Sequence, residues 1–78
     1  AALVELFGWG ESEFLRRHAG SAIRRIGYER WLRNLAVALG NAPALAEIVA
    51  ALRAKADHPS ALVREHVAWA LSRQEARG

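Results

Sequence analysis

Residues 20–41, GSAIRRIGYERWLRNLAVALGN, combine a strong helix pattern with most of the clustered arginines of the chain. The apolar residues of this stretch recur at spacings of three and four: Tyr28, Trp31, Leu32, Leu35 and Leu39. Such spacing puts the side chains on one face of a helix. We therefore predict a helix over residues 28–39 that ends at Gly40 and Asn41, because both residues tolerate the left-handed conformation found at helix ends.

Two shorter helices are expected before this stretch. Residues 3–7 form the first, which Gly8 closes, and residues 11–18 form the second. In the second helix the acids lie in the first turn and the basic residues in the last, an order that suits the helix dipole. Residues 23–27 fit a loop, a short helical turn or the start of the next helix, and the pattern does not choose among them.

A fourth helix is expected after the Gly-Asn stop, with Pro43 near its first turn. Its apolar stripe consists of Leu45, Ile48, Val49 and Leu52. The stripe fades near Ala56, and residues 57–60 form a turn in which Ser60 is a good N-cap. A fifth helix then covers residues 61–73.

The fifth helix resembles the third. Its buried face should consist of Val63, Val67, Ala70 and Leu71. A shift of 32 residues superimposes the apolar positions of residues 31–39 on those of residues 63–71, which is typical of a short helical repeat. The first two helices would cap the exposed end of this repeat, and residues 74–78 should fray. Because no segment alternates in the period-two manner of a strand, we predict an all-α fold of about five helices.

The composition indicates one small domain without cysteine chemistry. The chain has 78 residues, 53% of them hydrophobic and none of them cysteine, so disulfides and thiolate metal sites are excluded. No signal peptide or membrane span is recognisable, which favours a cytoplasmic location. Because the chain begins at Ala1 rather than Met, we expect residues 1–78 to be a single helical domain and a C-terminal fragment of a longer protein.

No group of residues has the spacing of an active site. The histidines, His18, His58 and His66, form no ligand-spaced set, and Arg64-Glu65-His66 lacks the second histidine of an HExxH helix. The glycines are scattered at helix ends instead of forming a phosphate loop. We therefore predict no catalytic residue and no metal site in this chain.

The arginine cluster is the strongest functional signal. The net charge is +3, and residues 16–33 contain six arginines with Glu29 as the only acid. The candidate phosphate ligands are Arg24, Arg25, Arg30 and Arg33, with Arg16 and Arg17 as further members. The planar guanidinium group suits bidentate recognition of phosphate better than the point charge of lysine does. The cluster therefore predicts a cationic surface for phosphate, carboxylate or RNA.

Three interpretations of the arginines that involve no ligand stay open at this point. A GC-rich genome would enrich arginine together with the abundant alanine. The residues Arg16, Arg17 and Arg33 could also bind helix-end carbonyls or pair with Glu13, Glu29 or Glu65, as we expect Arg64 to pair with the preceding turn at Asp57. Tyr28 and Trp31 fit the apolar stripe, so we assign them to the core and not to base stacking.

Six segments together resemble a known family. In order they are ESEF (11–14), GSAIRR (20–25), LRN (32–34), ALGN (38–41), DHPS (57–60) and VREHVAWAL (63–71). This ordered series is similar to the C-terminal region of the bacterial epoxyqueuosine reductase family and covers nearly the whole chain. The resemblance implies a HEAT-like helical repeat of the phycobilin-lyase type. The chain departs from the family pattern at Gly10, where a Ser or Thr cap is usual, and at Ala22, where proline is expected.

The resemblance also implies a function. The family reduces the epoxide of epoxyqueuosine in the wobble position of tRNA, using cobalamin and two 4Fe-4S clusters held by upstream cysteines. A chain without cysteine would hold neither cluster, and we expect none of these cofactors in this fragment. It would instead contact the tRNA near the anticodon arm through the arginines and pack against the upstream catalytic domains. The alternative is a protein-interaction or domain-packing module whose apolar patch makes the contact and whose arginines are solvated.

Overall fold

The computed structural model describes residues 2–77, which form six helices and contain no strand. The helices are α1 (Ala2–Phe7), α2 (Glu11–Arg17), α3 (Ile23–Ile26), α4 (Tyr28–Asn41), α5 (Ala46–Arg53) and α6 (Ala61–Arg77). The all-α prediction is confirmed. The sixth helix is the short α3, which resolves the segment that the sequence pattern left ambiguous.

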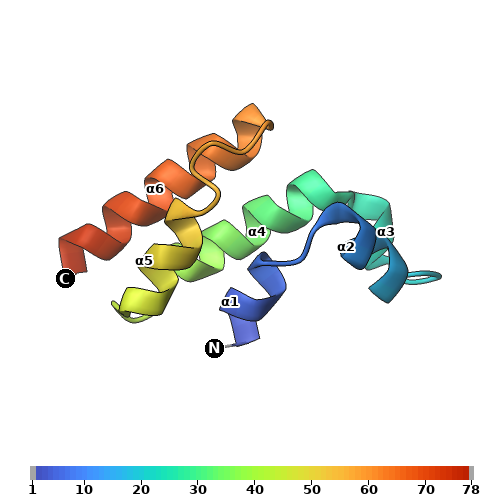
Figure 1. Cartoon of the computed structure of the whole chain (residues 1–78), viewed down its shortest axis with the longest axis horizontal. Helices are drawn as coiled ribbons and strands as arrows, with labels where there is room; N and C mark the ends of the chain where they lie inside the picture. The colour runs from blue at the N-terminus through green and yellow to red at the C-terminus, as the bar shows by residue number, and fades with distance from the viewer. Residues whose placement is uncertain (1, 78) are drawn as a thin grey trace.

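The centre of the fold is a pair of parallel helices, α4 and α6 (Figure 1). Helix α5 lies between them in the sequence, and with its loops it returns the chain to the end of the molecule where α6 begins. Contacts at both ends establish the parallel direction. Next to the start of α6, the Ser60 hydroxyl donates to the Glu29 carboxylate in the first turn of α4. Near the other end, Gln74 Nε2 of α6 lies 2.8 Å from the Leu39 carbonyl of α4. The helices that the 32-residue shift superimposes are therefore parallel neighbours.

The core lies between this pair and the helices that cover it. Its buried residues are Phe7, Leu32, Leu35, Ala36, Leu39, Ile48, Leu52, Val63, Val67 and Ala70. The predicted apolar faces of α4 and α6 are thus largely confirmed, with Tyr28, Trp31 and Leu71 half-buried at the edge of the core. Helix α1 packs against α4 and α5, and α2 packs against α4.

The predicted helix stop at Gly40 and Asn41 is confirmed in position, since α4 ends at Asn41, but the left-handed conformation expected there is wrong. Helix α4 continues through Gly40 to Asn41, and within residues 2–77 only Gly20 and Gly27 have positive φ angles. A Cβ atom on Gly40 would lie 2.6 Å from the Trp69 ring and 3.0 Å from the Ala70 Cα atom. Gly40 therefore serves the close approach of α6 and does not terminate the helix.

The predicted fraying of residues 74–78 is also wrong over the described residues. Helix α6 runs four residues beyond the expected end at Arg73, and Gln74 is only 1% exposed. Gly78 lies outside the described residues. Apolar periodicity missed this last turn because its buried side chain is polar.

Side chains of α6 cap the end of α4. Gln74 Nε2 donates to the carbonyls of Leu39, at 2.8 Å, and Ala42, at 2.9 Å. Arg77 Nη1 donates to the carbonyls of Gly40 and Ala42. Carbonyls at a helix end have no partner within the helix. A neighbouring helix here supplies the donors that a left-handed glycine turn would otherwise provide.

Around α5, the predictions for Pro43 and Leu45 are wrong and the prediction for Ser60 is confirmed. Pro43 lies in the loop before the helix and not near its first turn, because α5 begins at Ala46. Leu45, which the pattern assigned to the apolar stripe, precedes the helix and is 45% exposed. Ser60 is the N-cap of α6 as predicted, since its hydroxyl accepts a 3.2 Å bond from the Val63 amide.

We expect Gly40→Ala to lower the free energy of unfolding by about 1 kcal/mol. Overpacking a core contact costs roughly 1–3 kcal/mol, which exceeds the roughly 0.5–1 kcal/mol gained from replacing glycine inside a helix. Urea unfolding followed by circular dichroism measures the difference. Gly8→Ala is the control, because its added Cβ would meet nothing closer than 3.4 Å. A Gly40→Ala variant as stable as the parent chain would contradict the close-approach role.

We expect Gln74→Leu to destabilise the chain by about 1–3 kcal/mol. The substitution keeps the size of the side chain but removes the two hydrogen bonds that Gln74 donates to helix-end carbonyls, and each such bond contributes about 0.5–1.5 kcal/mol. Thermal and urea unfolding provide the measurement. The exposed neighbour Glu75→Gln should change stability by less than about 0.5 kcal/mol. Equal stability of the two variants would rule out the capping role.

Candidate functional site

The arginine cluster lies at one end of the molecule, where α2, α3 and the start of α4 meet (Figure 1). We call this surface the basic end, and its arginines are Arg16, Arg17, Arg24, Arg25, Arg30 and Arg33. Two glycines allow the chain to turn here, Gly20 with φ of 75° and Gly27 with φ of 86°. Other residues rarely adopt these angles. The fold thus brings the three arginine pairs of the sequence together at one end.

Aromatic packing holds α2 against α4 and so positions the basic end. The Trp9 and Trp31 rings stack with centroids 6.0 Å apart, and the His18 ring meets Trp31 edge-on at 4.8 Å. The Tyr28 hydroxyl donates a 2.6 Å hydrogen bond to the Trp9 carbonyl. Tyr28 and Trp31 are therefore half-buried in aromatic packing against the core, which agrees with their predicted assignment to the core.

The two arginines of α2 share one carboxylate. Arg16 Nη2 lies 2.7 Å and Arg17 Nε 2.6 Å from Oε2 of Glu13. The hydrogen bond from Arg17 and the charge of Arg16 hold the pKa of Glu13 below its ordinary value. Arg17 also lies over the Trp9 ring, 5.5 Å from its centroid. The pairing alternative is found for these two residues, although one acid neutralises only one of the two cations.

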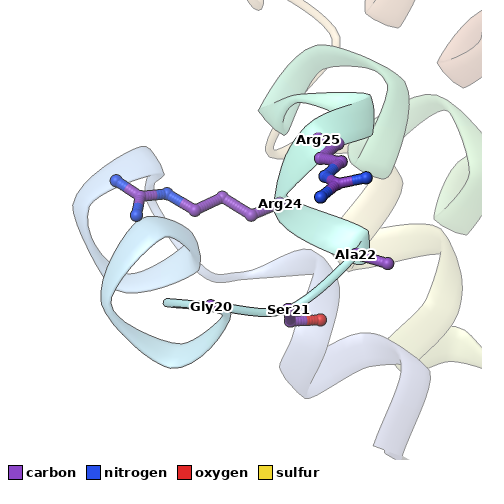
Figure 2. Close-up of a pocket in the computed structure, with 5 residues that line it drawn as sticks. All are labelled: Gly20, Ser21, Ala22, Arg24 and Arg25. Carbon is purple, nitrogen blue, oxygen red and sulfur yellow. The ribbon is translucent and has the colours of Figure 1, made fainter.

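The α3 arginines line an open depression of about 500 Å³ together with residues 20–22 (Figure 2). Figure 2 shows that the side chains of Arg24 and Arg25 point in different directions. Among residues 2–77, neither guanidinium has an ion-pair or hydrogen-bond partner. The Ser21 hydroxyl accepts a 3.1 Å bond from the Ile23 amide and so fixes the rim. The lining carries two cations and no acid.

The α4 arginines have no acidic partner either. Arg30 is exposed, and Arg33 Nε donates a 3.1 Å hydrogen bond to the Asn34 side chain. Glu29, one of the three acids considered as partners for the arginines, instead accepts the hydrogen bond from Ser60. Within the described part of the chain, the basic end therefore holds four arginines that no acid neutralises.

Arg64, in the first turn of α6, binds the preceding turn. Its Nη1 atom donates to the carbonyls of His58, at 2.8 Å, and Pro59, at 3.0 Å. The predicted location of this contact is confirmed, although the partners are backbone carbonyls and not the carboxylate of Asp57. Its guanidinium is thus committed to the turn before α6.

A second depression was not recognised from the sequence. It lies between α4 and α6 and is lined by Val37, Glu65, His66 and Trp69. The signal was available, because the buried face of α6 runs through Val63, Val67 and Ala70 and leaves the Trp69 position outside it. Trp69 is 40% exposed, a large value for this residue type.

Metal-binding groups and membrane-spanning helices are absent from the described residues. In residues 2–77, no three His, Cys, Asp or Glu side chains gather in a way that could hold a metal ion. No helix in that part of the chain has the length and apolar character required to cross a membrane.

Comparison with known proteins gives a consistent set of relatives. The epoxyqueuosine reductase of Pseudomonas aeruginosa is 63% identical over 73 residues, which are 94% of this chain and 20% of the relative. That of Xanthomonas campestris is 61% identical over 72 residues, or 92% of this chain and 20% of the relative. That of Escherichia coli is 58% identical over 73 residues, or 92% and 19%.

No protein-family model matches the chain, and no solved structure matches it, so the HEAT-like type of the repeat stays a prediction. The chain spans about a fifth of the length of the curated relatives that it matches. At this identity over more than nine-tenths of its length, the chain is a homologue of one segment of the epoxyqueuosine reductases.

Proposed function

We propose that residues 1–78 form a helical module that contacts tRNA for an epoxyqueuosine reductase, with the basic end as the RNA-binding surface. The observation that carries the proposal is the set of four arginines without an acidic partner, Arg24, Arg25, Arg30 and Arg33, at one end of a small domain. The relatives carry the name of an enzyme that modifies tRNA, and RNA presents the phosphates that such arginines bind.

The six arginines contribute to this surface in different ways. Arg24 and Arg25 line the depression and are ready to bind phosphate without breaking an ion pair. Arg30 and Arg33 extend the surface along α4. Arg16 and Arg17 must exchange Glu13 for phosphate and therefore contribute less. Contacts of this kind position the RNA but do not read its sequence.

The residues of this chain do not fit the iron–sulfur clusters that the resemblance implies. Iron–sulfur clusters require cysteine thiolates, and the chain contains none. The described residues also lack a group of side chains suited to a metal ion. In this proposal, cobalamin and the two 4Fe-4S clusters belong to other parts of the reductase, and this chain contributes binding and positioning of the tRNA.

A second function, packing against another protein domain, is favoured by one observation. Leu15, Ile23 and Ile26 on α2 and α3 are 36%, 41% and 41% exposed. Exposed apolar groups of this size are common at surfaces that meet another protein. The module could pack through these side chains and still present its arginines, so the decisive measurement concerns the arginines.

We expect Arg24→Glu with Arg25→Glu to weaken binding of a tRNA transcript by at least about tenfold at low salt. If about four phosphates are contacted, log K should fall with log salt at a slope near −3 in the parent chain, and the slope should become shallower in the variant. Fluorescence anisotropy with labelled tRNA measures both quantities.

A second comparison controls for net charge. It sets the single substitution Arg24→Glu in the basic end against Arg53→Glu on α5. Each changes the charge by the same amount, but Arg53 lies outside the basic end. Circular dichroism should show that all variants stay folded, because the replaced side chains are exposed. Equal losses of affinity for Arg24→Glu and Arg53→Glu would show that only net charge matters, and unchanged affinity for the double variant would refute the proposal.

A further inference from the structure

The depression between α4 and α6, which we call the α4–α6 groove, combines an aromatic ring with polar side chains. Its volume is about 400 Å³. Val37 and Trp69 supply apolar surface and are 36% and 40% exposed, while Glu65 and His66 supply polar atoms. Neither apolar side chain belongs to the buried core. The groove is therefore an accessible surface of mixed character whose lining includes no arginine of the basic end.

The Trp69 ring is held in place by the helix pair. Position 40 would bring a Cβ atom to 2.6 Å from this ring, so the indole lies directly against the glycine of α4. The Arg73 guanidinium also lies over the ring, 5.7 Å from its centroid. A ring positioned in this way loses little conformational freedom when a flat ligand stacks on it.

The polar atoms of the groove are acceptors. His66 Nδ1 lies 2.8 Å from the Leu62 carbonyl, which can only accept, so Nδ1 carries a hydrogen and Nε2 is the ring nitrogen that can accept a bond when the ring is neutral. Within residues 2–77, the Glu65 carboxylate has no ion-pair or hydrogen-bond partner. A complementary ligand has a flat face for Trp69 and N–H donors at its edge.

The charges around the groove favour an anionic ligand over a cationic one. Arg73 lies at one end, one turn beyond Trp69 on α6, and Arg33 lies one turn before Val37 on the same face of α4. Two cations against the single carboxylate of Glu65 disfavour a cationic side chain from a protein. A nucleotide satisfies both requirements, because its base carries the flat face and the donors while its phosphates carry negative charge.

We propose that the α4–α6 groove binds one unpaired nucleobase of RNA, stacked on Trp69. Glu65 and His66 accept hydrogen bonds from the edge of the base, and Arg33 and Arg73 contact the flanking phosphates. Guanine fits best, because its N1–H and N2–H groups can both reach a carboxylate, whereas uracil offers a single N–H. The inference rests on the proposed function and adds a contact that distinguishes bases, which the phosphate contacts of the basic end do not.

The test compares two single-stranded RNA heptamers, UUUGUUU and UUUUUUU, by fluorescence anisotropy with the 78-residue chain at low salt. The parent chain should bind the guanine heptamer more tightly. Trp69→Ala should weaken this binding about 10- to 100-fold, the loss typical of one base–aromatic stack, and leave the salt slope unchanged. Trp69→Phe should retain most of the affinity, and Glu65→Gln should abolish the preference for guanine.

The outcomes separate this inference from the proposed function. Equal affinity of the parent chain for both heptamers, or unchanged binding in a folded Trp69→Ala variant, overturns the groove proposal. If Arg24→Glu still weakens tRNA binding in that case, the basic end keeps its role. If the alanine variant unfolds, the Glu65→Gln variant decides, because a guanine preference that survives it overturns the proposal. Absence of any RNA binding by the parent chain overturns both.

Discussion

The close approach of α4 and α6 at Gly40 is the contact on which the rest of the structure depends. It lets the two helices lie side by side in parallel and bury Leu39 and Ala70 between them. Polar contacts at both ends, Glu29 with Ser60 and Gln74 with Leu39, then fix how far one helix is shifted along the other. The core, the end of α4 and the Trp69 ring all take their positions from this one alignment.

The basic end depends on a different kind of contact. Helices α2 and α3 are short, and helices of this length are not stable alone. Phe14 is fully buried, and aromatic rings packed on Trp31 hold α2 to the start of α4. The arginines lie on this small, firmly attached cap and not on the longer helices alone. A small change in the aromatic cluster would therefore move charged groups that make no contact with it.

Local patterns in the sequence predicted the helices well and tertiary contacts poorly. The apolar spacing of α4 and α6 located both helices and most of the core. Gly40 was misinterpreted because a helix-end glycine and a close-contact glycine look alike until the partner helix is known. The last turn of α6 was missed because Gln74 is polar, and only the carbonyls of α4 make its burial favourable.

The contrast between local patterns and tertiary contacts also holds for the candidate site. The pairing of Glu13 with Arg16 and Arg17 is local, at spacings of three and four, and could be anticipated. The lack of an acid beside Arg33 could not, because it depends on a bond between Glu29 and Ser60, which are 31 residues apart. Trp69 was absent from the predicted site although its exposure could be anticipated, since its position lies off the buried face of α6 that Val63, Val67 and Ala70 form.

The parallel direction of α4 and α6 has an electrostatic consequence for the whole molecule. Antiparallel neighbours cancel one another's helix dipoles, whereas parallel neighbours add them, and each N-terminus carries roughly half a positive charge. Both N-termini lie together, joined by Glu29 and Ser60, beside the arginines of the basic end. Backbone and side chains therefore polarise the molecule along its length in the same sense, and an approaching polyanion would be oriented before it makes its first contact.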